Sequence, residues 1–157
     1  MADEKERLAL LQETDLFRTL PAEALAAVAA KCEEGQAAEG TALLVEGKPA
    51  DALFVVASGA VDYIKKVEEK RGLMLFRWER GDVFGLNSVM EGKENYVSAV
   101  AASPVTYLKL PVVDFWAVGS EDPLYEHRLF RQTLLIQSAR LRQITVRLRE
   151  FLAKIIK

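Results

Sequence analysis

The sequence predicts a mainly β domain with flanking helices, and three observations lead to this fold class. The chain has 157 residues, a length that fits one domain. Between Gly35 and Leu110, recurring glycines separate short runs rich in β-branched and aromatic residues, as in antiparallel barrels and sandwiches. On both sides of this region the apolar residues have helical spacing. We therefore expect one domain over 1–157, with helices at 6–34, a β region at 35–110 and helices at 111–157.

The segment 6–34 is predicted to form two short helices. In its first half, apolar residues recur mainly every three to five positions, with an expected helix break at 13–15. Pro21 suits the first turn of the second helix, because the N–H that proline lacks has no partner there. The strong helix formers of 22–28 follow, and the second helix is expected to end near Cys32.

Six short runs in the β region are the predicted strands. They are rich in residues with high β propensity and are bounded by glycine, proline or polar clusters. Ser58-Gly59-Ala60, between two apolar runs, indicates a tight turn. The regular alternation of runs and turns favours antiparallel pairing over β-α-β units. The predicted strands are 42–45, 52–56, 61–64, 73–78, 97–100 and 105–108.

The last part of the chain is predicted to contain a short helix and then a long one. Residues 112–116 form the short helix, and 119–123 is the expected break. Asp122 is the expected N-cap of the long helix, with a proline at the first helical position. No glycine or proline follows, so a helix of about 30 residues, roughly 45 Å long, can continue to Lys157.

Apolar residues with a heptad spacing run along this long helix. One position repeats every seven residues, and the intervening position is also apolar except at Gln137. This is the pattern of a coiled-coil seam, and it predicts a homodimer through the C-terminal helix. The alternative is that the first half of the helix packs on its own β region. The predicted dimer-interface residues are Phe130, Leu134, Leu141, Ile144, Leu148, Phe151 and Ile155.

The scarcity of reactive side chains argues against an enzyme or a metalloprotein. Cys32 and His127 are the only cysteine and histidine, which excludes a disulfide, a thiolate zinc cage and an iron–sulfur cluster within one chain. His127 lies in a predicted helix, and the chain has no G-x-S-x-G motif. We expect no catalysis, no cofactor and no metal site.

The composition predicts a cytoplasmic protein without a membrane segment. Half of the residues are hydrophobic and 28% are charged. No run approaches the roughly 18 apolar residues that a membrane span requires. The segment 1–7 carries charges of both signs, unlike a signal peptide. We therefore expect no membrane partner.

Charge is unevenly distributed along the chain. After His127 there are eight basic residues and one acidic residue, whereas the part before it is acidic. Such a basic helix can bind nucleic acid, lie along an acidic body or face solvent. The last two are favoured, because the helix has no recognition motif and no aromatic residues interleaved for base stacking. DNA is thus not an expected partner.

Four motifs follow one another along 40–102. They are the glycine-bounded segment Gly40–Gly47, the apolar run 52–56 followed by Gly-Ala-Val at 59–61, the Gly-Asp-Val-Phe-Gly segment at 81–85, and the run 97–102. In this order and spacing they resemble the cyclic nucleotide-binding domain of the catabolite activator family, of cyclic-nucleotide-regulated kinases and of gated channels. The resemblance implies an antiparallel β-roll of the jelly-roll type, a nucleotide cassette at 81–102, a C-terminal dimer helix and a role in bacterial signal transduction. The helix-turn-helix domain of the catabolite activators is not expected here.

The cassette departs from the family at the two positions that carry charge. In the family, a glutamate directly after the cassette glycine holds the ribose 2′-hydroxyl, and an arginine about eleven residues past that glycine binds the phosphate. Counted from Gly85, these positions hold Leu86 and Tyr96. Each charged hydrogen bond contributes about 1.5 to 3 kcal/mol, so we expect weak or absent binding of cAMP and cGMP. Tyr96 is expected to fill the empty phosphate space.

The resemblance also implies which residues line the degenerate pocket. Ser98 matches a small polar residue that helps to hold phosphate, and Thr145 matches a base contact from the C-terminal helix, where Val146 replaces a serine. Lys93 and Arg77 are candidate substitute cations, although solvated surface charge is the favoured interpretation. The predicted pocket residues are Phe84, Gly85, Leu86, Asn87, Ser88, Tyr96, Val97, Ser98 and Thr145.

Three functions are compatible with these observations. The leading hypothesis is a non-enzymatic regulatory or scaffold module that acts through dimerisation and a protein partner and has lost ordinary cAMP and cGMP binding. The first alternative is a sensor that binds cAMP, cGMP or another nucleotide through altered pocket chemistry. The second alternative is a nucleic-acid binder that uses the basic helix.

Overall fold

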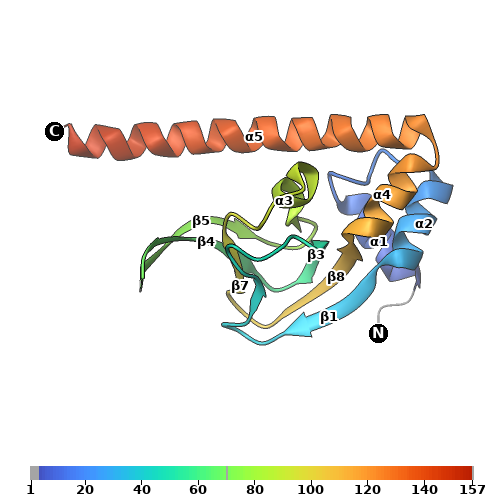
Figure 1. Cartoon of the computed structure of the whole chain (residues 1–157), viewed down its shortest axis with the longest axis horizontal. Coiled ribbons are helices and arrows are strands. Elements are labelled where there is room, and N and C mark those ends of the chain that lie inside the picture. Colours follow the sequence, from blue (N-terminus) through green and yellow to red (C-terminus); the bar gives the residue numbers. More distant parts are fainter. Residues whose placement is uncertain (1–3, 70, 157) are drawn as a thin grey trace.

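The structure is a computed structural model of the chain, and it describes residues 4–69 and 71–156 (Figure 1). Within these residues, two helices precede a β-roll that contains one short helix, and two further helices end the chain. The helices are α1 (Glu4–Glu13), α2 (Ala22–Lys31), α3 (Leu86–Glu91), α4 (Val112–Ser120) and α5 (Pro123–Ile155). The strands are β1 (Glu33–Ala37), β2 (Ala42–Leu44), β3 (Ala52–Ser58), β4 (Val61–Glu68), β5 (Arg71–Trp78), β6 (Val83–Phe84), β7 (Ser98–Ala101) and β8 (Val105–Pro111).

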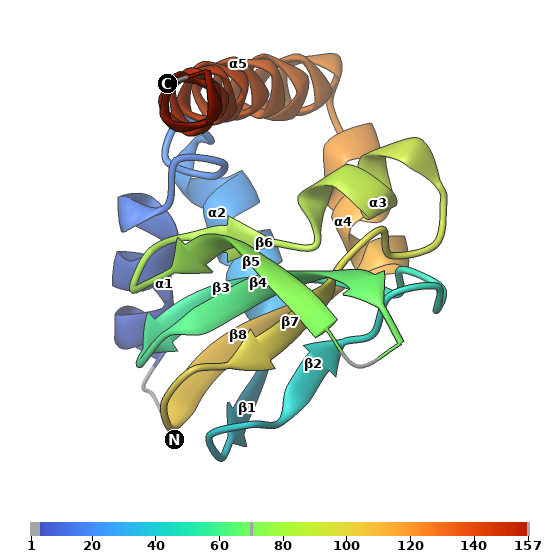
Figure 2. The same ribbon diagram turned by 90° about the vertical axis from the view of Figure 1, so that its left-hand side faces the viewer.

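The strands of the described residues form two antiparallel four-stranded sheets. Their strand orders are β1-β8-β3-β6 and β2-β7-β4-β5. Figure 2 shows this roll below α5, with α1 and α2 on one side and α3 on the other. The predicted fold class, mainly β with flanking helices and a long C-terminal helix, is therefore confirmed.

The expected helix boundaries follow from local chemistry. The side chain of Asp122 accepts a hydrogen bond from the Leu124 N–H at 2.7 Å, and Pro123 is the first helical residue, so the predicted start of α5 is confirmed. The expected break after Glu13 is also present, because α1 ends there. Pro21 lies directly before α2 rather than inside it. The expectation that the last helix continues to Lys157 falls on a residue outside those described.

Four features of the fold were not predicted. Strand β1 has no apolar alternation, yet it pairs with β8 from Glu33 opposite Lys109 to Ala37 opposite Val105. Two short elements, β6 and α3, lie inside the cassette. Helix α4 continues to Ser120, past the expected end at residue 116. Gly119 lies in this helix and faces α5, since an added Cβ would be 3.5 Å from the Leu129 side chain, an ordinary van der Waals contact.

Two apolar cores hold the molecule together. One lies between the N-terminal helices, α4, the start of α5 and one sheet, and it includes Leu11, Phe17 and Leu53. The other lies inside the roll and is largely aromatic, with the rings of Phe54 and Phe84 stacked at 4.9 Å. The second core forms the floor beneath the cassette.

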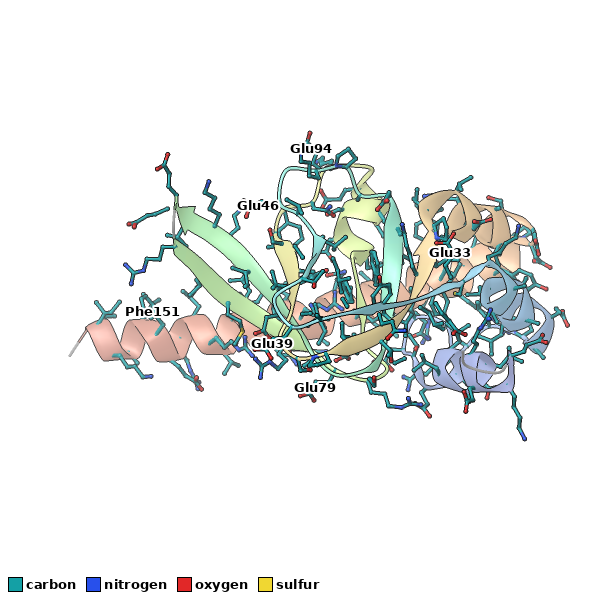
Figure 3. All side chains as sticks on the ribbon, turned by 90° about the horizontal axis from the view of Figure 1, so that it is seen from below. Glu33, Glu39, Glu46, Glu79, Glu94 and Phe151 are labelled. Atoms are coloured by element: carbon teal, nitrogen blue, oxygen red, sulfur yellow. The ribbon has the colours of Figure 1, made fainter. Side chains whose placement is uncertain are left out.

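Helix α5 lies across the top of the roll and then extends beyond it (Figure 1). Its buried residues all belong to its first third, and the side chains from Leu141 onward are exposed in the described part. The seven predicted dimer-interface residues are between 45% and 69% exposed. Figure 3 shows Phe151 on the part of the helix that extends past the roll. Among the described residues, no helix has the length and apolar content needed to cross a membrane.

Candidate functional site

The cassette is built around a sharp turn between β6 and α3. Gly85 adopts φ +84°, a left-handed conformation that favours glycine. A Cβ on this residue would lie 2.9 Å from the carbonyl oxygen of Ala52, so β3 also leaves no room for a side chain. The glycine motif therefore sets the path of the backbone into α3.

The backbone N–H of Gly85 is already occupied by a side chain of the protein. It donates a hydrogen bond of 2.6 Å to the hydroxyl oxygen of Tyr63, which comes from β4. Burial raises the pKa of the Tyr63 phenol far above its ordinary value, so the hydroxyl stays neutral. A neutral hydroxyl of the chain itself thus lies at the start of the cassette helix.

Tyr96, which is expected to fill the empty phosphate space, lies beside Tyr63. Its side chain is 42% exposed, and its ring stands nearly perpendicular to that of Tyr63 at 6.5 Å. The hydroxyl that meets the Gly85 amide belongs to Tyr63 instead. The reason is that Tyr63 points inward from a strand, whereas Tyr96 lies in the loop before β7.

Ser98, the predicted phosphate-side hydroxyl, is also engaged within the protein. Its Oγ accepts a hydrogen bond from the Glu46 N–H at 3.0 Å. The Glu46 carboxylate in turn accepts from Lys65 Nζ at 2.5 Å, and Lys65 donates to the Tyr96 carbonyl oxygen at 2.8 Å. The hydrogen bond from Lys65 is the main reason why the pKa of Glu46 is lowered. The loop that carries Tyr96 is thereby tied to β4.

The side chain of Leu86 does not face a ligand space. It is buried in the core that contains Val83 and Val89. The first turn of α3 thus directs the Leu86 side chain into the core, although the residue occupies the position of the family glutamate. Ser88 is buried as well, whereas Asn87 is partly exposed and accepts a hydrogen bond from Gln137 of α5 at 2.7 Å.

The predicted pocket residues divide into two groups. Phe84 and Val97 are buried in the aromatic core, where the Tyr63 ring lies 6.3 Å from that of Phe84. Thr145 lies on the exposed part of α5, and its hydroxyl donates to the Leu141 carbonyl oxygen one turn earlier. The structure thus brings the cassette residues near one another but engages Thr145 within its own helix.

Sequence reasoning missed Arg140, which brings positive charge to this region. Its guanidinium lies 4.2 Å from the ring centroid of Trp78 on β5 and donates to the Val83 carbonyl oxygen at 3.0 Å. Burial lowers the pKa of Arg140, and the nearby Tyr63, Tyr96 and Asp82 oppose this shift. Arg140 therefore fixes α5 to the roll next to the cassette.

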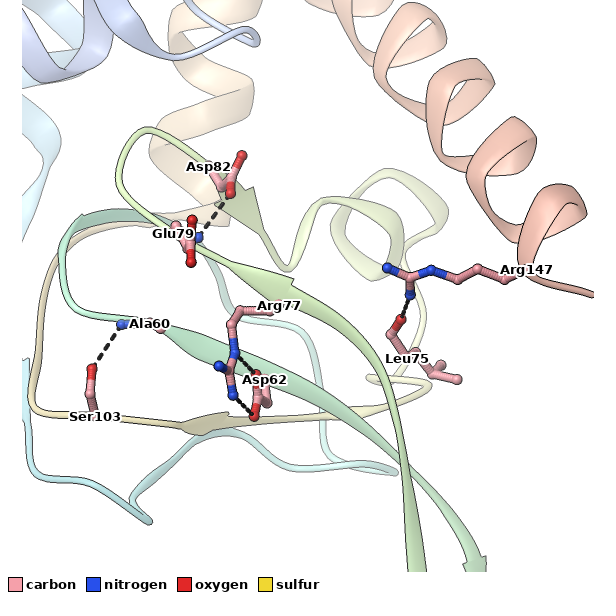
Figure 4. Close-up of polar contacts among 8 residues, drawn as sticks. All are labelled: Ala60, Asp62, Leu75, Arg77, Glu79, Asp82, Ser103 and Arg147. Atoms are coloured by element: carbon pink, nitrogen blue, oxygen red, sulfur yellow. Dashed lines mark hydrogen bonds and ion pairs between the residues drawn. The ribbon is translucent and has the colours of Figure 1, made fainter. Parts of the chain in front are cut away.

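Arg147 makes a second contact of the same kind one heptad later. It lies 5.3 Å from the ring centroid of Phe76 and donates to the carbonyl oxygen of Leu75 (Figure 4). The sequence shows the two arginines seven residues apart. It also shows the two aromatic residues of β5 two residues apart. No local rule connects the two pairs, because they are distant along the chain.

The two candidate substitute cations pair elsewhere. Arg77 makes a two-pronged ion pair with Asp62 at 2.7 and 2.9 Å (Figure 4). Lys93 lies 3.3 Å from Glu91, and both side chains are largely exposed. Their interpretation as surface charge agrees with these contacts.

The cavities of the described part of the protein include the following three. The first, of about 650 Å³, lies between α1 and the sheet that contains β1 and β8. The second, of about 300 Å³, lies between α5, the β5–β6 turn and the turn after α1. The third is a small space of about 10 Å³ between α3, α4 and α5. None of these three is lined by a predicted pocket residue.

Comparison with known proteins identifies the family. Residues 34–122, more than half of the chain, match the family model described as "Cyclic nucleotide-binding domain". The chain therefore belongs to the cyclic nucleotide-binding domain family, a family of regulatory domains.

Solved structures of similar fold agree with this assignment. A cyclic nucleotide-binding domain from Methylobacillus flagellatus KT is 23% identical, with a TM-score of 0.78, and the match covers 92% of this chain and 81% of the other. The catabolite activator protein of Thermus thermophilus is 26% identical, with a TM-score of 0.71, and the match covers 88% and 64% of the two chains.

A curated relative is much longer than this chain. Glutaminase 1 of Bradyrhizobium diazoefficiens is 30% identical over 131 residues. The match covers 83% of this chain but 21% of the glutaminase, so the chain spans about a fifth of that protein.

Proposed function

We propose that the protein is a non-enzymatic regulatory module that has lost ordinary cAMP and cGMP binding and acts through dimerisation and protein contacts. The observation that carries this proposal is the hydrogen bond between the Gly85 N–H and the Tyr63 hydroxyl. A cyclic phosphate at the start of α3 would have to displace this buried, neutral hydroxyl. The loss of that bond and the desolvation of the phosphate would both oppose binding.

The other cassette positions support the same conclusion. The position of the family arginine holds Tyr96, and Ser98 is bonded to the Glu46 backbone. Arg140 and Gln137 hold α5 near the cassette through contacts within the chain. These contacts between α5 and the roll involve only groups of the chain itself.

The exposed heptad stripe supports dimerisation. The seven residues predicted for the interface lie on one side of α5, and the second half of the helix extends beyond the roll. A stripe of this length is favourably buried against an identical stripe. Such a dimer would bind its protein partner through the roll or the helices. No residue pattern identifies this partner.

Calorimetric titration with cAMP and cGMP tests the loss of binding. We expect dissociation constants weaker than about 100 μM for both nucleotides. The variant Tyr63→Phe with Tyr96→Arg frees the Gly85 amide and restores a cation, so it should bind at least about tenfold more tightly. Leu86 is left unchanged because it belongs to the core. Tyr107→Phe, which removes a hydroxyl away from the cassette, is the matched control.

A wild-type dissociation constant near 1 μM would refute the loss of binding. It would favour the alternative of a nucleotide sensor with altered chemistry, which one observation supports. Arg140 and Lys65 both affect the Tyr96 phenol electrostatically, so positive charge is present near the position of the family arginine. In that case Arg140→Gln should abolish the binding.

DNA binding is not proposed. Arg140 and Arg147, two of the basic residues of α5, contact the roll through Trp78 and Phe76. Part of the basic charge of α5 therefore supports the packing of the helix along its own domain. A helix that lies along the body of its domain is one of the two favoured alternatives to DNA binding.

A further inference from the structure

The cavity of about 300 Å³ beneath α5 has walls of different chemistry. One wall is formed by Trp78 together with Arg140 and Gln143 of α5. The facing residues come from the turn after α1 and from the β5–β6 turn, and they include Glu13, Asp15 and Asp82. Gly81, Asp82 and Val83 of the cassette segment line this cavity, but none of the nine predicted pocket residues does.

The first wall offers hydrogen-bond donors without matching acceptors. Trp78 is only 7% exposed, and its indole N–H is buried beneath the cavity wall, without a hydrogen-bond partner among the described residues. Arg140 is half-buried, and within the described residues no carboxylate lies within ion-pair distance of it. One of its nitrogens donates to the Val83 carbonyl oxygen, which leaves other N–H groups of the guanidinium available. These groups suit a carboxylate.

The second wall is acidic and only partly neutralised. Glu13 lies 3.3 Å from Arg80, and Asp15 lies 3.3 Å from Arg18 in an exposed pair. Asp82 accepts a backbone hydrogen bond through one carboxylate oxygen only (Figure 4). Desolvation raises the pKa of Asp82. The hydrogen bond from the Glu79 N–H and the charge of Arg140 oppose this shift, whereas the charges of Glu79 and Asp15 add to it. The carboxylates of this wall favour a cationic group.

We infer that this cavity is a binding site for a small zwitterion that carries a carboxylate and an ammonium group. The carboxylate pairs with the free N–H groups of Arg140 beside the Trp78 ring, and the ammonium group pairs with Asp82 and Asp15. A simple anion would face the acidic wall without compensation, and a simple cation would leave the donors of Arg140 unpaired. A volume of about 300 Å³ holds a molecule of the size of an amino acid.

Occupancy of this site would act on α5. Arg140 lines the cavity and also holds α5 against Trp78. A carboxylate bound to Arg140 would therefore restrict the side chain that attaches the helix to the roll. The ligand therefore strengthens the packing of α5 on the roll, independently of any cyclic nucleotide.

Nuclear magnetic resonance of the indole N–H groups tests the site with defined probes. The probes are 6-aminohexanoate, which carries both charges, and hexanoate and hexylamine, which carry one each. We expect 6-aminohexanoate to shift the Trp78 indole signal and to leave that of Trp116 unchanged. Hexanoate and hexylamine should bind at least about tenfold more weakly, because each lacks one ion pair.

Two variants test which residue binds each end of the probe. Asp82→Asn and Arg140→Gln should each weaken 6-aminohexanoate binding at least about tenfold, whereas Arg142→Gln, an exposed neighbour in α5, should not. If Arg140→Gln disturbs the helix, the affinity of Asp82→Asn for 6-aminohexanoate decides the test. The proposal is overturned if the Trp78 signal is unmoved by 6-aminohexanoate up to about 10 mM. Equal binding of hexanoate or of hexylamine would also overturn it, in favour of a simple anion or cation site.

Discussion

The two halves of α5 have similar helical sequences but opposite environments. In the first half, Tyr125, Leu129 and Gln132 are buried against α2, α4 and the roll. In the second half, the described side chains from Leu141 onward are exposed, and the helix extends beyond the roll. Helix propensity alone does not distinguish the halves, because neither contains glycine or proline after the first residue. The difference shows that the first half is part of the domain core, whereas the second half leaves its apolar side chains exposed.

The largest expected effect concerns assembly through the second half. Leu141→Asp with Leu148→Asp should convert a micromolar homodimer into a monomer while the roll stays folded, because both charges lie on the apolar stripe. Added salt should tighten the wild-type dimer by screening the repeated arginines. Sedimentation equilibrium measures both effects.

A matched control places the same two charges off the stripe. Val146→Asp with Ala153→Asp should remain dimeric, because these positions lie on another side of the heptad pattern. If the wild-type protein is a monomer at about 100 μM, the dimer is refuted, and the stripe serves another protein or its own domain.

The next effect compares packing in the two halves directly. Leu129 is 5% exposed, so Leu129→Ala should reduce the free energy of unfolding by about 2–5 kcal/mol. Leu152 is exposed in the second half, and Leu152→Ala should change that free energy by no more than about 0.5 kcal/mol. Urea unfolding followed by circular dichroism gives both values. Equal losses would show that the second half is as well packed as the first.

A smaller effect is expected at the boundary between the halves. Arg140→Ala with Arg147→Ala removes both cation–π contacts, each of which contributes about 0.5–2 kcal/mol. Amide hydrogen exchange in residues 134–147 should therefore become faster. Arg142→Ala with Arg149→Ala, which changes exposed arginines of the same segment, should leave the exchange rates almost unchanged. Equal acceleration in both variants would show that the contacts with β5 do not hold the helix.

The smallest effect concerns the ion pair beside Tyr96. Because the pKa of Glu46 is lowered in the folded protein, its contribution to stability is present above the unfolded pKa and is lost as the pH falls through the folded pKa. Lys65→Ala should raise the pKa of Glu46 towards its ordinary value, since Lys65 donates the dominant hydrogen bond. Carbon-detected NMR titration of the Glu46 carboxyl measures this shift. Lys66→Ala is the control. It keeps the backbone hydrogen bond to Glu46 and removes only the weakest of the charge effects, so the pKa of Glu46 should rise much less.

The candidate site was predictable only in part. The cassette turn was recognisable from its glycines, because the left-handed conformation of Gly85 restricts the residue type. The orientation of Leu86 was not, because the same position after a turn can face a ligand or the core. Tyr63 was also missed, since its partner, the Gly85 amide, lies 22 residues away in the chain.

The sequence by itself determined the features that depend on near neighbours. Asp122 and the proline after it start α5, the heptad spacing defines its apolar stripe, and the spacing of the glycine motifs identifies the roll. The tertiary structure alone decided that polar strand β1 pairs with β8, that Tyr63 meets Gly85 and that Arg140 meets Val83, 57 residues apart. The physical reason is that capping and periodicity act within a few residues. Pairing between distant groups depends instead on where the whole chain places them.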